Sequence, residues 1–223
     1  IFYTYILMWL LVYQKIFEEK KKDKKLLAEK DELLLQQVKI NSMINGLDKK
    51  HPKIKGVKTG DKIISSEDFK TEIPKIISNL DNSYIYIQGP PGTGKTYQAS
   101  NAIIELLKQN KKIGITGLSH KVIHNLLQRV EDMAKEKQFN FEGYKRGTLE
   151  DEDTVFNGEF IKTYEKDPVF MDALKEKDVG QIFAGTKYHL ASTFYDQKID
   201  YLFIDEAGQI SLADLISIGN VAK

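Results

Sequence analysis

Residues 84–96 read YIYIQGPPGTGKT, an apolar run that leads into a glycine-rich loop closed by a lysine and a threonine. The pattern G-x-x-x-x-G-K-[ST] is typical of a phosphate-binding loop when it follows a strand and opens a helix. Here the apolar run 84–88 predicts the strand, and residues 95–109 predict the helix. The sequence therefore indicates an α/β fold built around a nucleotide-binding P-loop.

The members of this loop have distinct expected roles. Its glycines let backbone N–H groups turn inward around phosphates, and the N-terminus of the following helix adds partial positive charge. Lys95 is expected to reach the β- and γ-phosphates, and the Thr96 hydroxyl is expected to ligate Mg²⁺. The predicted nucleotide-binding residues are Gly89, Pro90, Pro91, Gly92, Thr93, Gly94, Lys95 and Thr96.

An acidic pair closes a second apolar run, because residues 201–206 read YLFIDE. In a parallel sheet the carboxyl ends of the strands face the ligand crevice. Asp205 is expected to hold Mg²⁺ through water, and Glu206 is expected to orient and deprotonate the attacking water. An acidic pair after a strand is weak evidence alone, but together with the upstream loop it indicates nucleotide hydrolysis.

Beyond residue 63, short β-rich apolar runs alternate with helical stretches, the pattern of a mostly parallel sheet with helices on both faces. The expected strands are residues 84–88, 112–116, 181–184 and 201–204. The expected helices are residues 95–109, 120–137, 187–194 and 211–220. The polar stretch 139–166 has no clear period, and we expect it to be an irregular insertion.

The first 60 residues differ in composition from the rest. Residues 1–13 are almost wholly apolar, but polar residues close this run well short of the roughly 20 residues that a membrane span needs. Three interpretations of this run remain open: the start of a helix packed on the protein, a truncated membrane or signal segment, and an artefact of how the chain is delimited. Residues 15–50 favour a long solvated helix, and residues 51–61 resemble a linker. We therefore expect a helical extension with its linker over 1–60 and a globular lobe over 61–223.

Composition limits the other kinds of site. The chain has no cysteine, which excludes disulfides and thiolate metal sites within it and fits a reducing cytoplasm. With 33 basic and 32 acidic residues, nucleic-acid binding would need a local patch. Because the chain begins at Ile1 and ends soon after the acidic pair, we expect it to be a fragment.

Two strings together carry a family resemblance. Residues 87–96 (IQGPPGTGKT) and 205–209 (DEAGQ) closely resemble superfamily 1 helicases of the RNA-surveillance and replication-nuclease branch. The resemblance covers roughly residues 83–223. It implies ATP and Mg²⁺ as cofactors, a first RecA-like lobe truncated after the acidic strand, and a second lobe outside this chain. It also adds Gln209 to Lys95, Asp205 and Glu206 as a catalytic residue.

The same resemblance implies a track of single-stranded DNA or RNA. Residues 116–127 look like motif Ia of that branch and residues 184–186 like its motif Ic, which makes Ser119, His120, Lys121 and Thr186 the candidate nucleic-acid contacts. The string SHK at residues 119–121 and QISLAD at residues 209–214 look most like bacterial and archaeal proteins that fuse a RecB-like nuclease to such a helicase. An adenine-reading glutamine has no counterpart, since residues 63–82 contain none.

Other interpretations account for less of the sequence. A nucleotide switch of the GTPase kind needs an N/T-K-x-D motif, and the nearest strings, at residues 110–113 and 186–189, lack the aspartate. A small-molecule kinase needs an arginine-rich lid, but only Arg129 and Arg146 are arginines. A membrane-anchored structural protein leaves the phosphate loop unexplained. His120 and His124 lie four residues apart on one predicted helix, but no carboxylate or cysteine joins them to make a metal site.

Overall fold

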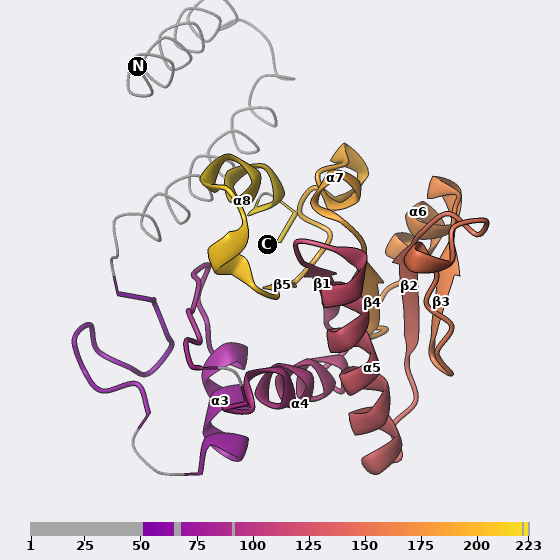
Figure 1. Ribbon diagram of the computed structural model, residues 1–223. Helices are drawn as coiled ribbons and strands as arrows, with labels where there is room; N and C mark the ends of the chain where they lie inside the picture. Colours follow the sequence, from indigo (N-terminus) through magenta and orange to yellow (C-terminus); the bar gives the residue numbers. More distant parts are fainter. Residues whose placement is uncertain (1–50, 65–67, 91, 220, 223) are drawn as a thin grey trace, which may run out of the picture. The chain divides into compact units, whose positions relative to one another are not determined.

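The structure is a computed structural model that describes residues 51–64, 68–90, 92–219 and 221–222 (Figure 1). The apolar run 1–13 and the predicted long helix 15–50 lie outside the described residues. Ile54 is buried and forms an isolated antiparallel bridge with Leu80, so the segment with linker-like composition takes part in the packing. The proposed division at residue 60 stays a prediction.

The centre of the fold is a five-stranded sheet in the order β3-β2-β4-β1-β5. All four strand pairings are parallel, which confirms the predicted α/β class. The strands are β1 (Lys112–Thr116), β2 (Glu142–Arg146), β3 (Ile161–Tyr164), β4 (Gln181–Ala184) and β5 (Tyr201–Ile204). Ile115 of β1 lies opposite Ala184 of β4, so these two strands end at the same edge of the sheet.

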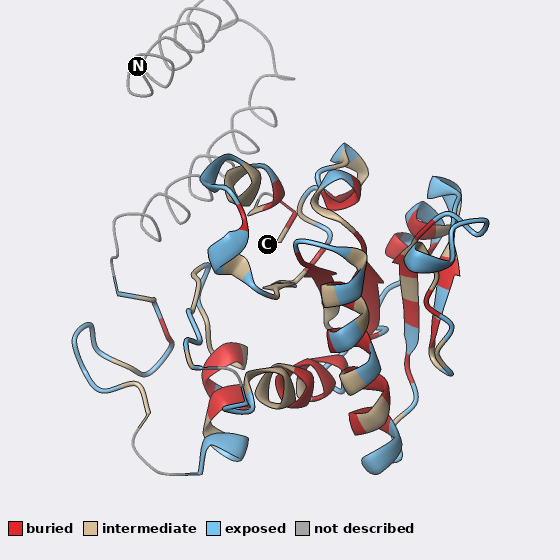
Figure 2. Cartoon of the chain, in the orientation of Figure 1, coloured by how far each residue is buried: buried red, intermediate tan, exposed pale blue. Residues whose placement is uncertain are grey.

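Helices cover both faces of this sheet (Figures 1 and 2). The α-helices are α3 (Phe69–Ser78), α4 (Lys95–Leu107), α5 (His120–Glu136), α6 (Asp167–Lys175), α7 (Lys187–Leu190) and α8 (Leu212–Gly219). The 3₁₀ turns are η1 (Glu152–Thr154), η2 (Thr193–Tyr195) and η3 (Ala207–Gln209).

Alternate residues of the strands feed two apolar clusters. Ile182 and Ala184 of β4 pack with α3, α4 and α5, whereas Phe183 between them packs with Phe170 of α6 and Leu190 of α7. This alternation follows from the period of two in a strand. Among the described residues, no helix combines the length and apolarity needed to cross a bilayer.

The predicted insertion 139–166 is wrong, because this segment contributes strands β2 and β3. The buried positions of β2 are Gly143 and Lys145, so the apolar alternation that marks a strand is missing there. The pairing is set instead by neighbours: Gly143 lies opposite Ile161 on one side and Ile182 on the other. A Cβ at position 143 would collide with Ile161, which explains why glycine stands there.

The predicted strand 84–88 is not part of the sheet, and the chain there is irregular. Ile85 packs against the core, but Tyr86 is 65% exposed and Ile87 is 38% exposed. The apolar pattern of this segment correctly indicates contact with the core, but such a pattern alone does not determine whether the segment hydrogen-bonds to a neighbouring strand. Two other bounds also differ: the expected helix 187–194 divides into α7 and η2, and α8 is shorter than residues 211–220.

Candidate functional site

The glycine-rich loop turns through two left-handed residues before α4 begins. Gly92 has a φ of 81° and Gly94 a φ of 83°, a region that side chains rarely adopt. Gly94 is the N-cap of α4 and no side chain caps this helix. The first-turn N–H groups of α4 therefore carry the partial positive charge of a helix N-terminus without a capping carboxylate or hydroxyl. Pro91 lies outside the described residues.

The Lys95 ammonium closes the loop on itself. Its Nζ donates to the carbonyl oxygen of Gly89 at 2.5 Å and to that of Pro90 at 2.8 Å. The Thr93 hydroxyl also donates to the Pro90 carbonyl, at 2.8 Å. A Cβ at position 89 would lie 2.7 Å from Thr93 Oγ1, so the loop needs glycine there. The lysine is thus held over the loop by neutral acceptors that an anionic phosphate can replace.

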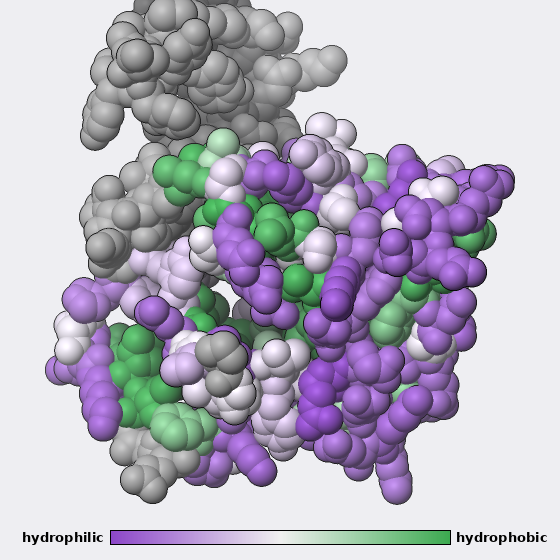
Figure 3. All heavy atoms as spheres, in the orientation of Figure 1, coloured by the Kyte–Doolittle hydropathy of each residue, from purple (hydrophilic) through white to green (hydrophobic). Residues whose placement is uncertain are grey.

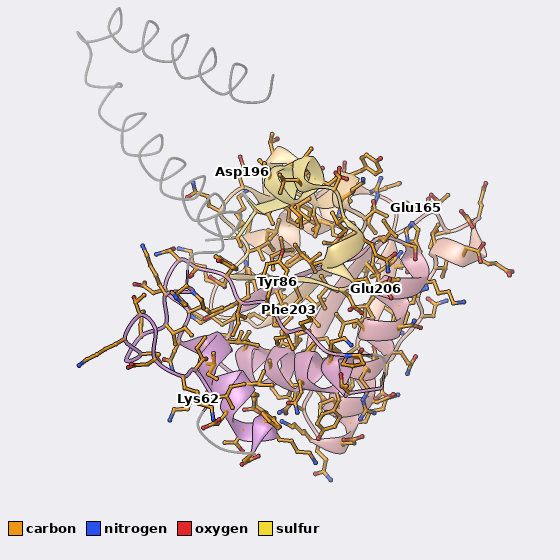
Figure 4. The ribbon with its side chains drawn as sticks, turned by 60° about the vertical axis from the view of Figure 1, so that its left-hand side comes forward. Lys62, Tyr86, Glu165, Asp196, Phe203 and Glu206 are labelled. Carbon is orange, nitrogen blue, oxygen red and sulfur yellow. The ribbon has the colours of Figure 1, made fainter. Side chains whose placement is uncertain are left out.

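The acidic pair and Gln209 form one turn at the carboxyl end of β5. The Asp205 N–H donates to the Thr116 carbonyl at 3.0 Å, which extends the β1–β5 pairing by one residue. Glu206 follows in the left-handed region with a φ of 54°, and its N–H donates to Asp205 Oδ1 at 3.0 Å. Gln209 Nε2 donates to Glu206 Oε2 at 3.2 Å. Figure 4 shows Glu206 just beyond Phe203 of β5.

The oxygen donors at this edge fit a hydrated Mg²⁺ ion. Thr116 is next to the acidic turn, because its carbonyl accepts from the Asp205 N–H, and its buried Oγ1 has no hydrogen-bond partner among the described residues. Mg²⁺ usually keeps several waters and takes only one or two carboxylates together with substrate phosphates. Thr96 and Asp205 would hold such an ion, although no hydrogen bond between described residues joins the loop to the acidic turn.

The predicted nucleic-acid residues lie at the ends of two adjacent strands. Ser119 is the N-cap of α5, where its Oγ accepts from the Val122 N–H at 3.3 Å, and Lys121 is exposed in the first turn of that helix. Thr186 is the N-cap of α7 and makes no capping hydrogen bond. Because β1 and β4 pair in parallel, these residues share one edge of the sheet. Figure 3 shows hydrophilic side chains over the outward face of α5.

His120 contacts a buried lysine that sequence reasoning missed. Lys145 of β2 has no exposed surface, and its Nζ lies 2.7 Å from His120 Nδ1. Burial, with a smaller contribution from the Lys145 charge, lowers the pKa of His124 to about 4. The Lys145 ammonium against the His120 ring disfavours a metal ion at His120 and His124, because its positive charge would repel a bound cation. No group of three or more metal-binding side chains exists within the described ranges.

A second missed contact joins the two segments that follow β4 and β5. Lys187 follows Thr186 in sequence, and its Nζ lies 2.5 Å from Asp214 Oδ2. The Ser211 hydroxyl donates to the same oxygen at 2.6 Å. Hydrogen bonds from Lys187 and Ser211 lower the pKa of Asp214. In the sequence, the string QISLAD at residues 209–214, which ends at Asp214, was the feature that could have indicated this contact. The pair connects the start of α7 to the first turn of α8.

Acid should destabilise the fold through its buried histidines. His189 is 8% exposed, its Nε2 lies 2.7 Å from the Tyr195 hydroxyl, and burial, with the charge of Arg146, lowers its pKa to about 4. The unfolded chain then binds more protons than the folded chain between pH 6.5 and 4, so stability falls as pH falls through this window. From pH 7 to pH 5, His189 should cost about 1 to 2 kcal/mol of unfolding free energy.

Urea unfolding at pH 7, 6 and 5 measures this loss. His189→Gln, which cannot take up a proton, should be less stable at pH 7 but should lose less stability on acidification. An equal loss in both proteins would show that His189 is not held neutral in the fold.

Comparison with known proteins agrees with this arrangement. The sequence profile of the family described as RNA cytidine acetyltransferase NAT10/TcmA, helicase domain, matches residues 86–222, which is more than half of the chain. The chain is also 32% identical over 138 residues to the DNA replication ATP-dependent helicase/nuclease dna2 of Schizosaccharomyces pombe. That alignment covers 58% of this chain and only 9% of the relative.

The family match falls on the part of the chain that contains both the loop and the acidic turn. The two similarities support a helicase-like protein of superfamily 1 type that uses nucleotide. The parallel sheet, with the loop before α4 and the acidic pair after β5, is consistent with a RecA-like lobe. The chain belongs to the NAT10/TcmA helicase-domain family.

Proposed function

We propose that this lobe binds Mg–ATP and, together with a second RecA-like lobe, couples hydrolysis to movement along single-stranded nucleic acid. The observation that carries the proposal is the uncapped N-terminus of α4 behind two left-handed glycines. The Lys95 ammonium is held over the loop there by carbonyl oxygens of Gly89 and Pro90. This is the arrangement that a polyphosphate would complete, because its oxygens are stronger acceptors for both the N–H groups and the ammonium.

The residues of the site divide the chemistry among them. Lys95 would neutralise the β- and γ-phosphates, while Thr96 and Asp205 would hold the Mg²⁺ ion. Glu206 would orient and deprotonate the attacking water, and Gln209, hydrogen-bonded to Glu206, would position that carboxylate. The left-handed backbone at Glu206 supports this role, since strained residues often lie at functional turns.

Hydrolysis by this chain alone should be very slow. Stabilising charge on the transferred phosphoryl group needs an arginine, which is worth about 10³ to 10⁵ in rate. Arg146 is paired with Asp167 of α6 at 3.0 Å, and Arg129 of α5 lies over the Tyr97 ring and near Glu136. Within the described part of the chain, neither arginine interacts with the loop, so the second lobe would supply this charge.

The track would follow the edge that carries Ser119, His120, Lys121 and Thr186. Hydroxyls and a lysine there would grip phosphates without reading bases, as a motor that moves over any sequence requires. DNA and RNA both remain open as the track, since the family description names an RNA-modifying enzyme and the fission-yeast relative a DNA replication helicase. We also retain, as proposals, the DEAGQ-type branch, an upstream nuclease domain, a cytoplasmic location and the lobe boundary near residue 61.

Lys121→Ala tests the track in the chain as it stands. One lysine–phosphate contact contributes about 0.7 to the slope of log affinity against log salt on a single strand. The variant should lower that slope by about this amount and should weaken binding equally for oligonucleotides of different sequence. Fluorescence anisotropy with labelled single-stranded DNA and RNA between 50 and about 200 mM salt gives the slope.

Lys198→Ala is the matched control, because this lysine is exposed just before the amino end of β5, at the opposite edge of the sheet. It should leave the slope unchanged. Loss of binding to one sequence alone in Lys121→Ala, with an unchanged slope, would place the strand elsewhere.

A further inference from the structure

Lys145 is a charged side chain in the interior that the proposed chemistry does not use. It projects from β2 with no exposed surface, and three acceptors surround its Nζ. These are the Arg146 carbonyl at 2.7 Å, the Thr154 carbonyl at 2.5 Å and His120 Nδ1 at 2.7 Å. An ammonium group has three N–H bonds and no lone pair, so this site satisfies all of its donors.

While Lys145 is charged, its hydrogen bonds to the two carbonyls allow only one tautomer of neutral His120. Each carbonyl must accept a proton from Nζ, and the third N–H of the ammonium then points at His120 Nδ1. Nδ1 must accept, so the single ring proton of neutral His120 resides on Nε2. Among the described residues, no hydrogen bond engages Nε2, and the ring is partly exposed at the first residue of α5.

We infer that the Lys145 ammonium fixes His120 as the Nε2–H tautomer, so that His120 presents a hydrogen-bond donor to a phosphate of the bound strand. Lys145 is thus a positioning residue that acts through His120. The inference rests on the proposed nucleic-acid edge for its purpose, but the tautomer itself is a property of the free protein.

Loss of the Lys145 proton would reverse the donor pattern. A neutral amine has two N–H bonds, which the two carbonyls take, and one lone pair, which accepts from His120 Nδ1–H. Nε2 would then be a bare acceptor and would repel a phosphate oxygen. Burial lowers the pKa of Lys145 to about 8, so the donor tautomer is present below that pH and is lost above it.

The surrounding charges favour the neutral ring over this range. Burial and the Lys145 charge lower the pKa of His120, and His124 on the same helix stays neutral. Asp151, before η1, is the acidic group that acts on both Lys145 and His120. His189 of α7 also senses the Lys145 charge and is neutral above pH 4. Lys145 is therefore the group in this cluster that titrates near pH 8.

Nitrogen-15 NMR of the histidine rings in the free 223-residue chain tests the tautomer, with His120→Gln used to assign the signal. His120 should show a protonated Nε2 at pH 7 and should move toward a protonated Nδ1 as pH rises from 7 to 9. In Lys145→Met this change of tautomer with pH should disappear. A protonated Nδ1 in the wild-type chain at pH 7, or the same change between pH 7 and 9 in a folded Lys145→Met protein, would overturn the inference.

Binding of a single-stranded oligonucleotide separates this inference from the proposed function. Wild-type affinity should fall about threefold to tenfold as pH rises from 7 to 9, the value of one neutral hydrogen bond. His120→Gln, whose amide N–H₂ replaces the Nε2–H donor, should bind with an affinity that does not change over this pH range. If His120→Gln keeps the wild-type pH dependence, Lys145 does not act through His120. If NMR shows the Nε2–H tautomer but none of these proteins binds the oligonucleotide, the proposed nucleic-acid edge is wrong and the inference about the tautomer stands.

Discussion

Lys95→Ala is expected to weaken Mg–ATP binding about 100-fold. The wild-type ammonium donates to the Gly89 and Pro90 carbonyls, and phosphate oxygens would replace these neutral acceptors with charged ones. Hydrogen bonds to charged groups are worth about 1.5 to 3 kcal/mol each, and 1.4 kcal/mol corresponds to tenfold in affinity. Because the lysine gives up its two carbonyl contacts when the nucleotide binds, we expect the loss of binding free energy to lie near the lower end of the range for two such hydrogen bonds. Titration with a fluorescent ATP analogue measures it.

Lys108→Ala provides the matched control for that change. Lys108 follows α4 at its C-terminal end and pairs with Glu105 at 3.1 Å on the surface. Its removal takes away the same charge from the same helix but leaves the loop intact, so affinity should change less than twofold by analogy with other surface pairs. Equal affinity in wild type and Lys95→Ala would remove the nucleotide assignment from the loop.

Glu131→Ala should cause the largest loss of stability, about 3 to 5 kcal/mol of unfolding free energy. Glu131 of α5 is 1% exposed, and its carboxylate accepts from the N–H groups of Glu159, Phe160 and Ile161 at 2.8 to 2.9 Å. These three donors form the turn that leads into β3. Alanine would leave them unsatisfied beneath the surface. Since small domains have only about 5 to 15 kcal/mol of stability, the variant should be close to unfolded at 37 °C.

Three further variants make this result specific. Glu131→Gln keeps one carbonyl oxygen but sets its amide group against a backbone donor, so it should cost less, about 1 to 3 kcal/mol. Gly158→Ala should also destabilise, because a Cβ there would overlap the Glu131 carboxylate. Glu159→Ala removes an exposed carboxylate that pairs with Lys135 on the surface and should change stability by less than about 0.5 kcal/mol. If urea unfolding shows the same free energy of unfolding for Glu131→Ala and Glu159→Ala, the role of Glu131 is contradicted.

Much of the fold could be predicted because its elements are written in local patterns. β1, β4 and β5 are short apolar runs, as buried parallel strands usually are, and the amphipathic stretch of α5 has the helical period. The acidic turn also follows from local sequence, since Asp205, Glu206 and Gln209 are close enough along the chain to hydrogen-bond within one turn. Ser119 as the N-cap of α5 is another local feature that the sequence indicates.

The remainder depends on residues far apart in sequence. β2 buries a lysine because Thr154 and His120 supply its acceptors, and neither partner is visible from the pattern around residue 145. β3 is fixed by Glu131, which lies 28 to 30 residues away from the donors it accepts from. The segment 84–88 has the pattern of a strand, but whether it joins a ladder depends on a neighbouring strand edge, which only the assembled fold defines.

A crystal structure of this chain with Mg²⁺ and a non-hydrolysable ATP analogue would show whether the loop holds the nucleotide. The phosphates should be enclosed by the loop, with the Lys95 ammonium moved from the Gly89 and Pro90 carbonyls onto phosphate oxygens. A Mg²⁺ ion should lie between the Thr96 hydroxyl and the Asp205 side chain. A nucleotide bound elsewhere, such as the groove of about 500 Å³ that includes Lys75, Tyr97 and Lys137, with Lys95 still on its carbonyls, would contradict the assignment of the loop as the nucleotide site.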